Sequence, residues 1–179
     1  VFSELQDVSA VELGRVALVD VLRRGGVSVE EVDEVVFGNV AGPPDATNVA
    51  RVIALRSGIP ADRISHTVNR NCASGMESIL GAWHAIDQRG AKFVIAGGTE
   101  SMSNIPLLWR RDATALWLRL AKSKSLTQKL GTLASFRPRH FKPVVGVELG
   151  LTDPVSGLNM GETAEVLAKE FAITREDQD

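Results

Sequence analysis

Cysteine is nearly absent from this 179-residue sequence, and the residue spacings typical of metal sites are missing altogether. The single cysteine, Cys72, excludes an internal disulfide and suits either a reducing compartment or a cysteine kept for its chemistry. No CxxC or HxxxH spacing occurs, and the three histidines lie far apart in the sequence. We therefore expect no metal site.

Long apolar runs are also missing. None reaches the ~18 residues that a membrane-spanning helix needs, and Val1 does not open the charged-then-apolar pattern of a secretory leader. A hydrophobic fraction of 44%, a charged fraction of 23% and a net charge of −2 are typical of a soluble globular chain. We expect a soluble protein of a reducing compartment, either the bacterial cytoplasm or the mitochondrial matrix.

Both ends suggest a longer parent protein. The sequence starts without Met, and near its end Thr174 and Asp177 have the spacing that normally begins a helix. We expect the 179 residues to be a piece of a larger chain.

The periodicity of the apolar residues predicts an α/β fold. Helical spacing, capping residues and glycine stops alternate with short β-rich runs, and the helix over 74–89 joins two runs into a right-handed parallel unit. The stripe in the first helix consists of Val11, Leu18, Val21 and Leu22. The predicted helices cover residues 9–25, 48–57, 74–89 and 161–171, and the predicted strands cover residues 35–40, 64–70 and 92–98.

Cys72 falls in the turn between a predicted strand and a predicted helix. There the thiol faces unpaired N–H groups and the positive end of the helix dipole, which favour the nucleophilic thiolate, and the backbone N–H of Cys72 could help to hold an oxyanion. Small residues at positions 73–75 permit a sharp turn and close approach of a substrate. The same turn also suits an inert, tightly packed cysteine, so geometry alone leaves both interpretations open.

A cysteine nucleophile usually works with a histidine base, and no histidine stands out. His66 lies on the strand that leads to Cys72, His84 lies well inside the following helix, and His140 lies in a basic segment. We interpret each as structural or solvent-facing, which leaves the catalytic set incomplete.

Four motifs together resemble the thiolase family. Residues 68–75, VNRNCASG, resemble the acyl-enzyme motif V-N-x-x-C-x-S-G, and residues 96–103, AGGTESMS, resemble the segment AGGxExMS. Residues 48–51, NVAR, are similar to the family's N-x-A-R helix start, and residues 159–165, NMGETAE, to its x-M-G-x-T-A-E segment. The resemblance covers nearly the whole chain.

The resemblance implies a layered αβαβα fold in which two similar βαβ-type halves pack together. Residues 1–104 would be the amino-terminal half without its first strand, and residues 105–179 would be part of the loop domain that covers coenzyme A. The family's histidine base and second cysteine lie in the carboxyl half, which this chain does not contain. The chain by itself is therefore expected to be inactive.

The resemblance also implies a mechanism. Cys72 would take the acyl group of a 3-ketoacyl-CoA as acetyl-CoA leaves, and a fresh coenzyme A would then remove the acyl group. Coenzyme A is thus a substrate, and no bound cofactor is expected. Met160 matches a position that lines the acyl and pantetheine pocket. Asn159 stands where many biosynthetic thiolases have His, so the resemblance does not decide whether Asn159 contacts pantetheine.

Two stretches favour degradation over biosynthesis. Residues 118–126 and 136–141 resemble the loop region of thiolase subunits in multienzyme complexes of fatty-acid β-oxidation. A biosynthetic acetoacetyl-CoA thiolase and a non-catalytic partner subunit remain alternatives. A decarboxylating condensing enzyme is disfavoured by the run at 69–75. The family further implies a homo-oligomer.

The basic segment, residues 109–142, has three possible interpretations. Its cations are interleaved with Trp and Leu, which is typical of a solvated charged face, of a site for coenzyme A phosphates, or of a surface for a membrane or a partner subunit. Nucleic acid is disfavoured by the acidic remainder of the chain. Only Asp112 is acidic here, and the cations are Arg110, Arg111, Arg119, Lys122, Lys124, Lys129, Arg137, Arg139 and Lys142.

Overall fold

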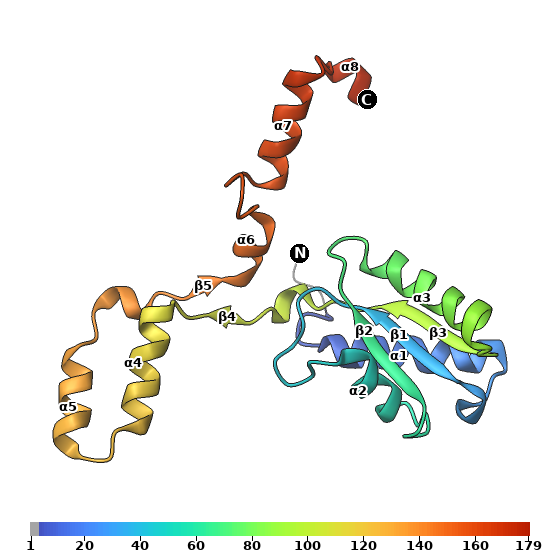
Figure 1. The fold of residues 1–179 in the computed structure, drawn as a ribbon, viewed down its shortest axis with the longest axis horizontal. Coiled ribbons are helices and arrows are strands. Elements are labelled where there is room, and N and C mark those ends of the chain that lie inside the picture. Colours follow the sequence, from blue (N-terminus) through green and yellow to red (C-terminus); the bar gives the residue numbers. More distant parts are fainter. Residues whose placement is uncertain (1–3) are drawn as a thin grey trace. The chain divides into compact units, whose positions relative to one another are not determined.

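The computed structural model describes residues 4–179, without the side chains at positions 145 and 147–149. Val1, at which we expect no secretory leader to begin, lies outside the described residues. The chain forms two compact units, Val1–Ile105 and Pro106–Asp179, each described separately below. Figure 1 shows a sheet covered by helices in the first unit and mostly helices in the second.

A parallel sheet forms the centre of the first unit. Its three strands lie in the order β2 (Ile64–Val68), β1 (Glu34–Gly38) and β3 (Val94–Gly98), and β1 pairs in parallel with both neighbours. The β-branched middle strand is buried along its whole length, as a strand covered on both faces should be. The predicted α/β class is confirmed, although β1 and β2 end two residues before the predicted ends at 40 and 70.

Helices cover both faces of this sheet. α1 and α2 pack together on one face, and α3 crosses the other face to connect β2 with β3 (Figure 1). Because α3 passes over β1, the two strands that it joins are not neighbours. The helical elements of this unit are α1 (Ala10–Gly25), η1 (Val29–Glu31), α2 (Val49–Arg56), α3 (Ser74–Arg89) and η2 (Met102–Asn104).

The helix ends follow from local side-chain chemistry. The Ser9 hydroxyl accepts a hydrogen bond from the Glu12 amide at 3.2 Å and begins α1, and Gly26 ends it with φ 65°. Asn48 caps α2 through the Arg51 amide at 3.2 Å, and Gly90 ends α3 with φ 73°. The predicted boundaries of these three helices are confirmed to within one residue.

The main hydrophobic core lies between the sheet and the pair α1–α2. Its residues are Val11, Leu18, Leu22, Val32, Val35, Phe37, Ala46, Val49, Ala50, Ile53, Ala54 and Ile59. Val21, which the pattern placed in the buried stripe of α1, is 52% exposed, so that part of the prediction is wrong.

α3 turns its small residues toward the sheet and its large ones away from it. Its buried residues are Ser74, Ser78, Ala82 and Ala85. Ile79, Trp83 and Ile86 form an apolar stripe at helical spacing, and they are about half exposed. The stripe therefore does not face the sheet of its own unit, because the helix lies too close to the strands for large side chains.

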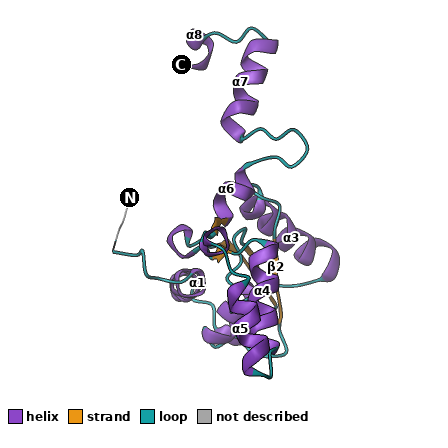
Figure 2. Cartoon of the chain, turned by 90° about the vertical axis from the view of Figure 1, so that its left-hand side faces the viewer, coloured by secondary structure: helices purple, strands orange, loops and turns teal. Residues whose placement is uncertain are grey.

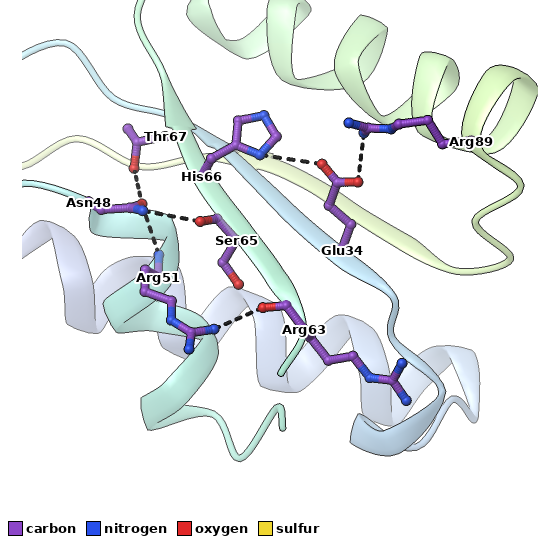
Figure 3. Close-up of polar contacts among 8 residues, drawn as sticks. All are labelled: Glu34, Asn48, Arg51, Arg63, Ser65, His66, Thr67 and Arg89. Carbon is purple, nitrogen blue, oxygen red and sulfur yellow. Dashed lines mark hydrogen bonds and ion pairs between the residues drawn. The ribbon is translucent and has the colours of Figure 1, made fainter. Parts of the chain in front are cut away.

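Side chains of the 48–51 motif bind the outer edge of β2 (Figure 3). Asn48 Nδ2 donates to the Ser65 carbonyl at 3.1 Å, and Arg51 Nη1 donates to the Arg63 carbonyl at 2.9 Å. The Thr67 hydroxyl donates to Asn48 Oδ1 at 3.0 Å. These hydrogen bonds attach α2 to the edge strand β2, and they occupy backbone carbonyl groups that the edge of a sheet would otherwise leave without a partner.

The second unit is built mainly of helices joined by loops (Figure 2). α4 and α5 form a helical hairpin, and β4 pairs antiparallel with β5. The pattern predicted the helix from 161, which begins one residue earlier, but did not delimit α4 or α5. The elements are β4 (Leu107–Leu108), α4 (Arg111–Lys122), α5 (Leu126–Ala134), η3 (Pro138–Phe141), β5 (Val144–Val145), α6 (Gly146–Leu151), α7 (Met160–Glu170) and α8 (Arg175–Gln178).

An aromatic cluster closes the base of the hairpin. The Trp117 ring lies 4.8 Å from the Phe136 ring and 6.2 Å from the Phe141 ring, both edge to face. Beside it, buried His140 lies 3.5 Å from Asp112. Desolvation raises the pKa of Asp112, but the hydrogen bond from the next amide and the nearby cations outweigh it, so the pKa lies below its ordinary value.

Within α2, a side chain buried in the core should be more sensitive to mutation than an exposed one. Ile53 is fully buried, whereas Leu55 in the same helix is 46% exposed. We expect Ile53→Ala to destabilise the protein by roughly 2–5 kcal/mol, because it leaves a cavity, and Leu55→Ala by less than about 1 kcal/mol. Urea unfolding of the two variants measures the difference, and equal midpoints would contradict this description of the core.

Candidate active site

The carboxyl ends of the three parallel strands meet at a pocket beside Cys72. Its volume is ≈ 310 Å³, and residues that follow each strand line it. This edge of an open parallel sheet is where α/β proteins commonly bind their ligands. The lining residues are Gly38, Asn39, Val40, Asn71, Cys72, Ser74, Gly75, Gly98, Thr99 and Glu100.

Cys72 lies in the predicted turn between β2 and α3, and it is exposed. The preceding residue, Asn71, has φ 50°, a left-handed conformation that Asn tolerates better than most residues. Such a sharp strand-to-helix turn projects the side chain that follows it, as in the nucleophile elbows of hydrolases.

Ser74 holds this turn in shape. Its hydroxyl accepts a hydrogen bond from the Arg70 amide at 2.8 Å and donates one to the Asn71 carbonyl at 2.6 Å. The Ala73 amide also donates to the Arg70 carbonyl at 3.1 Å. The serine of the family motif therefore has a structural role that is visible in the chain itself: it holds the backbone on both sides of Cys72.

Gly38 lets the turn come close to the middle strand. A Cβ atom added to it would lie 2.6 Å from the carbonyl carbon and oxygen of Ser74 and 2.9 Å from the Gly75 nitrogen. These are backbone atoms, so they cannot move aside as a flexible side chain can. The amino terminus of α3 can therefore lie where it does only because β1 ends in a glycine.

Glu100 clamps the loop that follows β1. Its carboxylate accepts a hydrogen bond from the Val40 amide at 2.8 Å, from the Ala41 amide at 3.3 Å and from Asn39 Nδ2 at 3.0 Å. Asn39 Nδ2 also donates to the Thr99 carbonyl at 2.8 Å. Sequence reasoning gave these residues no separate role, because their partners are about 60 positions away in the chain; the only signal was Glu100 in the motif at 96–103.

The three histidines make their contacts away from Cys72. His66 Nδ1 lies 3.3 Å from the buried carboxylate of Glu34, which also pairs with Arg89 Nη2 at 2.7 Å (Figure 3). His84 is exposed and lies beside Trp83, with ring centroids 5.2 Å apart and the rings tilted by 36°. His140 is buried beside Asp112. These contacts agree with the prediction that none of the three is an obvious base.

Asn159 and Met160 lie in the second unit, at the start of α7. Asn159 Oδ1 accepts a hydrogen bond from the Glu162 amide at 2.9 Å, and Glu162 accepts one from the Asn159 amide in return. This is a capping box. Met160 follows it and is 59% exposed. The two units are described separately, so a pocket shared with Cys72 stays a prediction.

These features define a class of protein: an α/β fold with an exposed thiol on a strand-to-helix elbow, suited to covalent catalysis by cysteine. The family model for "Thiolase, N-terminal domain" matches residues 2–179. The chain belongs to the thiolase family, as the four motifs indicated.

Curated relatives and solved structures agree with this assignment. The 3-ketoacyl-CoA thiolase of Yersinia pestis (strain Pestoides F) is 35% identical over 172 residues, which are 96% of this chain and 39% of the relative. The crystal structure of the Bacillus anthracis acetyl-CoA acetyltransferase matches with a TM-score of 0.78 and 33% identity, over 98% of this chain and 40% of that one.

A third match is the human mitochondrial 3-ketoacyl-CoA thiolase in complex with CoA. Its TM-score is 0.75 and its identity 34%, over 97% of this chain and 39% of that one. The chain therefore spans about two fifths of the length of the relatives that it matches.

Neither a metal cluster nor a membrane span is found in the described part of the chain. Among the described side chains, no group of three or more His, Cys, Asp or Glu is arranged to hold a metal ion. None of the helices in residues 4–179 is both long and apolar enough to cross a bilayer.

The close approach at Gly38 leads to a test of the elbow. We expect Gly38→Ala to displace the turn that carries Cys72, because the added Cβ atom would meet backbone atoms that cannot move aside. The rate at which iodoacetamide alkylates Cys72, followed by peptide mass spectrometry, should also change.

Gly81→Ala is the matched control for this substitution. Gly81 lies in α3, and a Cβ atom added there would meet only the Val36 side chain, at an ordinary 3.7 Å. Alanine is also a better helix former than glycine. Equal alkylation rates in the two variants would contradict the role given to Gly38.

Proposed function

We propose that the complete protein is a thiolase that moves an acyl group between 3-ketoacyl-CoA, acetyl-CoA and CoA through a thioester on Cys72. The observation that carries the proposal is the exposed thiol of Cys72 on a sharp elbow, inside a pocket at the carboxyl edge of the sheet. Membership of the thiolase family supplies the reaction class.

In the proposed reaction, the Cys72 thiolate attacks the 3-keto carbon of the substrate. The bond between carbons 2 and 3 then breaks, its electron pair leaves with acetyl-CoA as the enolate, and an acid protonates the enolate. The acyl group stays on sulfur until a CoA thiolate attacks it and releases Cys72. Two steps thus replace one difficult step: the first expels the enolate of acetyl-CoA, and the second expels the Cys72 thiolate, which is a good leaving group. The family resemblance puts the histidine base and the acid cysteine in the carboxyl half.

The outward stripe of α3 supports a two-half arrangement. Ile79, Trp83 and Ile86 together expose a large apolar surface, which a soluble protein seldom leaves in water. In a layered αβαβα fold, this helix face would pack against the second half. We therefore assign residues 1–104 to the first half and residues 105–179 to the loop domain.

Within the loop domain, we propose that Met160 and Asn159 contact the acyl and pantetheine groups. Met160 offers an exposed, flexible apolar side chain. Asn159 uses Oδ1 for the cap of α7, which leaves Nδ2 as the donor to a ligand.

Degradation in fatty-acid β-oxidation is the physiological role that we favour. The reasons are the resemblance of the basic segment to the loop of β-oxidation complexes and the 3-ketoacyl-CoA thiolase name of the Yersinia relatives. A biosynthetic acetyl-CoA acetyltransferase is the second candidate, supported by the likeness to the Bacillus anthracis enzyme of that name. For either role we propose a homo-oligomer in the bacterial cytoplasm or the mitochondrial matrix.

Thiolysis assays of the complete protein test the reaction. We expect cleavage of 3-ketoacyl-CoA thioesters with long acyl chains at higher kcat/KM than acetoacetyl-CoA, and a loss of more than about a thousandfold in Cys72→Ala. Mass spectrometry should show an acyl adduct on Cys72 in the native protein only.

Full activity in Cys72→Ala would disprove the proposed role. A preference for acetoacetyl-CoA would favour the biosynthetic acetyl-CoA acetyltransferase over the proposed role in β-oxidation. Residues 1–179 alone should show no turnover, since the base is expected in the carboxyl half; turnover by this piece would contradict the two-half account.

A pair of substitutions separates the two roles of Asn159. Asp caps helices as well as Asn does, but it lacks the amide donor, so we expect Asn159→Asp to raise the KM for CoA several-fold at unchanged stability. Asn159→Ala should in addition destabilise α7 by about 1 kcal/mol, measured by thermal unfolding. An unchanged KM for CoA in Asn159→Asp would mean that Asn159 caps α7 but does not contact CoA.

A further inference from the structure

Asn69 lies where the middle strand and the edge strand separate. The backbone ladder between β1 and β2 runs as far as Asn39, whose N–H donates to the Val68 carbonyl at 3.1 Å. Past this bond, β1 continues into the loop at Val40, and β2 continues into the turn that carries Cys72. Asn69 is the residue that follows this bond on the β2 side.

The side-chain amide of Asn69 bridges the two diverging chains. Its Nδ2 donates to the Val40 carbonyl at 3.3 Å, and its Oδ1 accepts a hydrogen bond from the Asn71 amide at 3.0 Å. Both partners are backbone groups of fixed polarity, so the side chain can make both bonds in only one orientation. With one donor and one acceptor in use, the amide bonds as a peptide group does, and it takes the place of a further rung of the ladder.

A second side chain holds Val40 from the other side of the loop. The Val40 amide donates to the Glu100 carboxylate at 2.8 Å, while the Val40 carbonyl is bound by Asn69. Glu100 also follows a backbone bond between two strands, since the Thr99 amide donates to the Gly38 carbonyl at 3.0 Å. Both backbone polar groups of Val40 are therefore bound by side chains that come from the two neighbouring strands.

The bridge joins two residues of one pocket. Val40 and Cys72 both line it, and both are exposed enough to meet a ligand. Asn69 binds Val40 on one side and the residue directly before Cys72 on the other. These bonds all lie within the first unit, so the bridge does not depend on what the rest of the parent protein covers. Asn69 itself is exposed, and exposed hydrogen bonds add little to stability.

We propose that Asn69 is a positioning residue of the acyl-transfer reaction: through Val40 and Asn71 it fixes the Cys72 thiol relative to the wall of the pocket. A nucleophile must lie at a suitable distance and direction from the carbon that it attacks, and small displacements are costly. Glu100 supports the bridge by holding the other side of Val40. The inference rests on the proposed function, because it needs a substrate carbon for Cys72 to attack.

Asn69→Asp removes the bridge but keeps the bond within the turn. An Asp carboxylate still accepts a hydrogen bond from the Asn71 amide, but it offers no donor to the Val40 carbonyl. In thiolysis by the complete protein we expect kcat to fall about tenfold while the KM for 3-ketoacyl-CoA stays within about twofold, because only the nucleophile is misplaced. A purely structural role would lower the melting temperature and leave the kcat of the folded protein unchanged.

Hydrogen–deuterium exchange, followed by mass spectrometry, measures the bridge without turnover. The peptide 38–42 should exchange roughly fivefold faster in Asn69→Asp, because the loop loses one of the bonds that hold it, although Asn69 is 29 positions from Val40. A complete protein without thiolysis would disprove the proposed function and the positioning role with it. An active protein with unchanged exchange would disprove the bridge alone.

Asn104→Asp is the matched control. Asn104 is another exposed asparagine of the first unit, and its Nδ2 donates to the carbonyls of Gln6 at 2.9 Å and Val8 at 3.2 Å. It is not among the residues that line the pocket beside Cys72. The same chemical change at this position should leave kcat and the exchange of the peptide 38–42 unchanged.

Glu100→Gln tests whether the two side chains act through Val40. Gln has one acceptor oxygen for the three N–H groups that the carboxylate now binds, so this change also loosens the loop. We expect kcat to fall about tenfold. Together with Asn69→Asp, the loss should stay far below the roughly hundredfold that independent effects would give. Circular dichroism and thermal unfolding show that each variant is folded.

Four outcomes would overturn the proposal. The first is a folded Asn69→Asp protein with native kcat, and the second is unchanged exchange of the peptide 38–42 in that variant. The third is an equal fall of kcat in Asn104→Asp, which would make the effect unspecific. The fourth is a full multiplication of the losses in the double variant, which would mean that Asn69 and Glu100 do not act through the same residue.

Discussion

The absence of a side chain at Gly38 is the constraint on which the site depends. It lets the backbone of Ser74 and Gly75 approach the middle strand more closely than any Cβ atom would allow. The amino terminus of α3 can therefore lie at the end of the sheet, with Cys72 in the turn before it. Ser74 then holds this turn through hydrogen bonds on both sides of Cys72.

The same close approach explains the unusual distribution of residues in α3. A helix so near the strands can bury only small side chains against them, so Ser78, Ala82 and Ala85 face the sheet. Its large apolar residues, such as Trp83, are left on the other face. A helix with two usable faces suits the middle of a layered fold. In the proposed two-half arrangement, the turn before α3 carries Cys72 and the outer face of α3 packs against the second half.

Much of the fold follows from local patterns. The caps at Ser9 and Asn48 and the left-handed glycines at 26 and 90 have their partners within one or two helical turns, and they set the boundaries of α1, α2 and α3. The α4–α5 hairpin was not delimited from the sequence, where cations interrupt the apolar residues. The clamp by Glu100 could not be derived either, since it joins loops that follow different strands.

The sequence by itself determined the α/β class, the position of Cys72 in a strand-to-helix turn and the thiolase family, because these depend on short-range periodicity and on contiguous motifs. Only the tertiary structure decided which way side chains point. It turned the stripe of α3 away from its sheet, directed His66 to Glu34 and brought Glu100 under the loop at Val40. Those contacts join elements that are distant in the chain, and their geometry depends on how closely the backbones can approach.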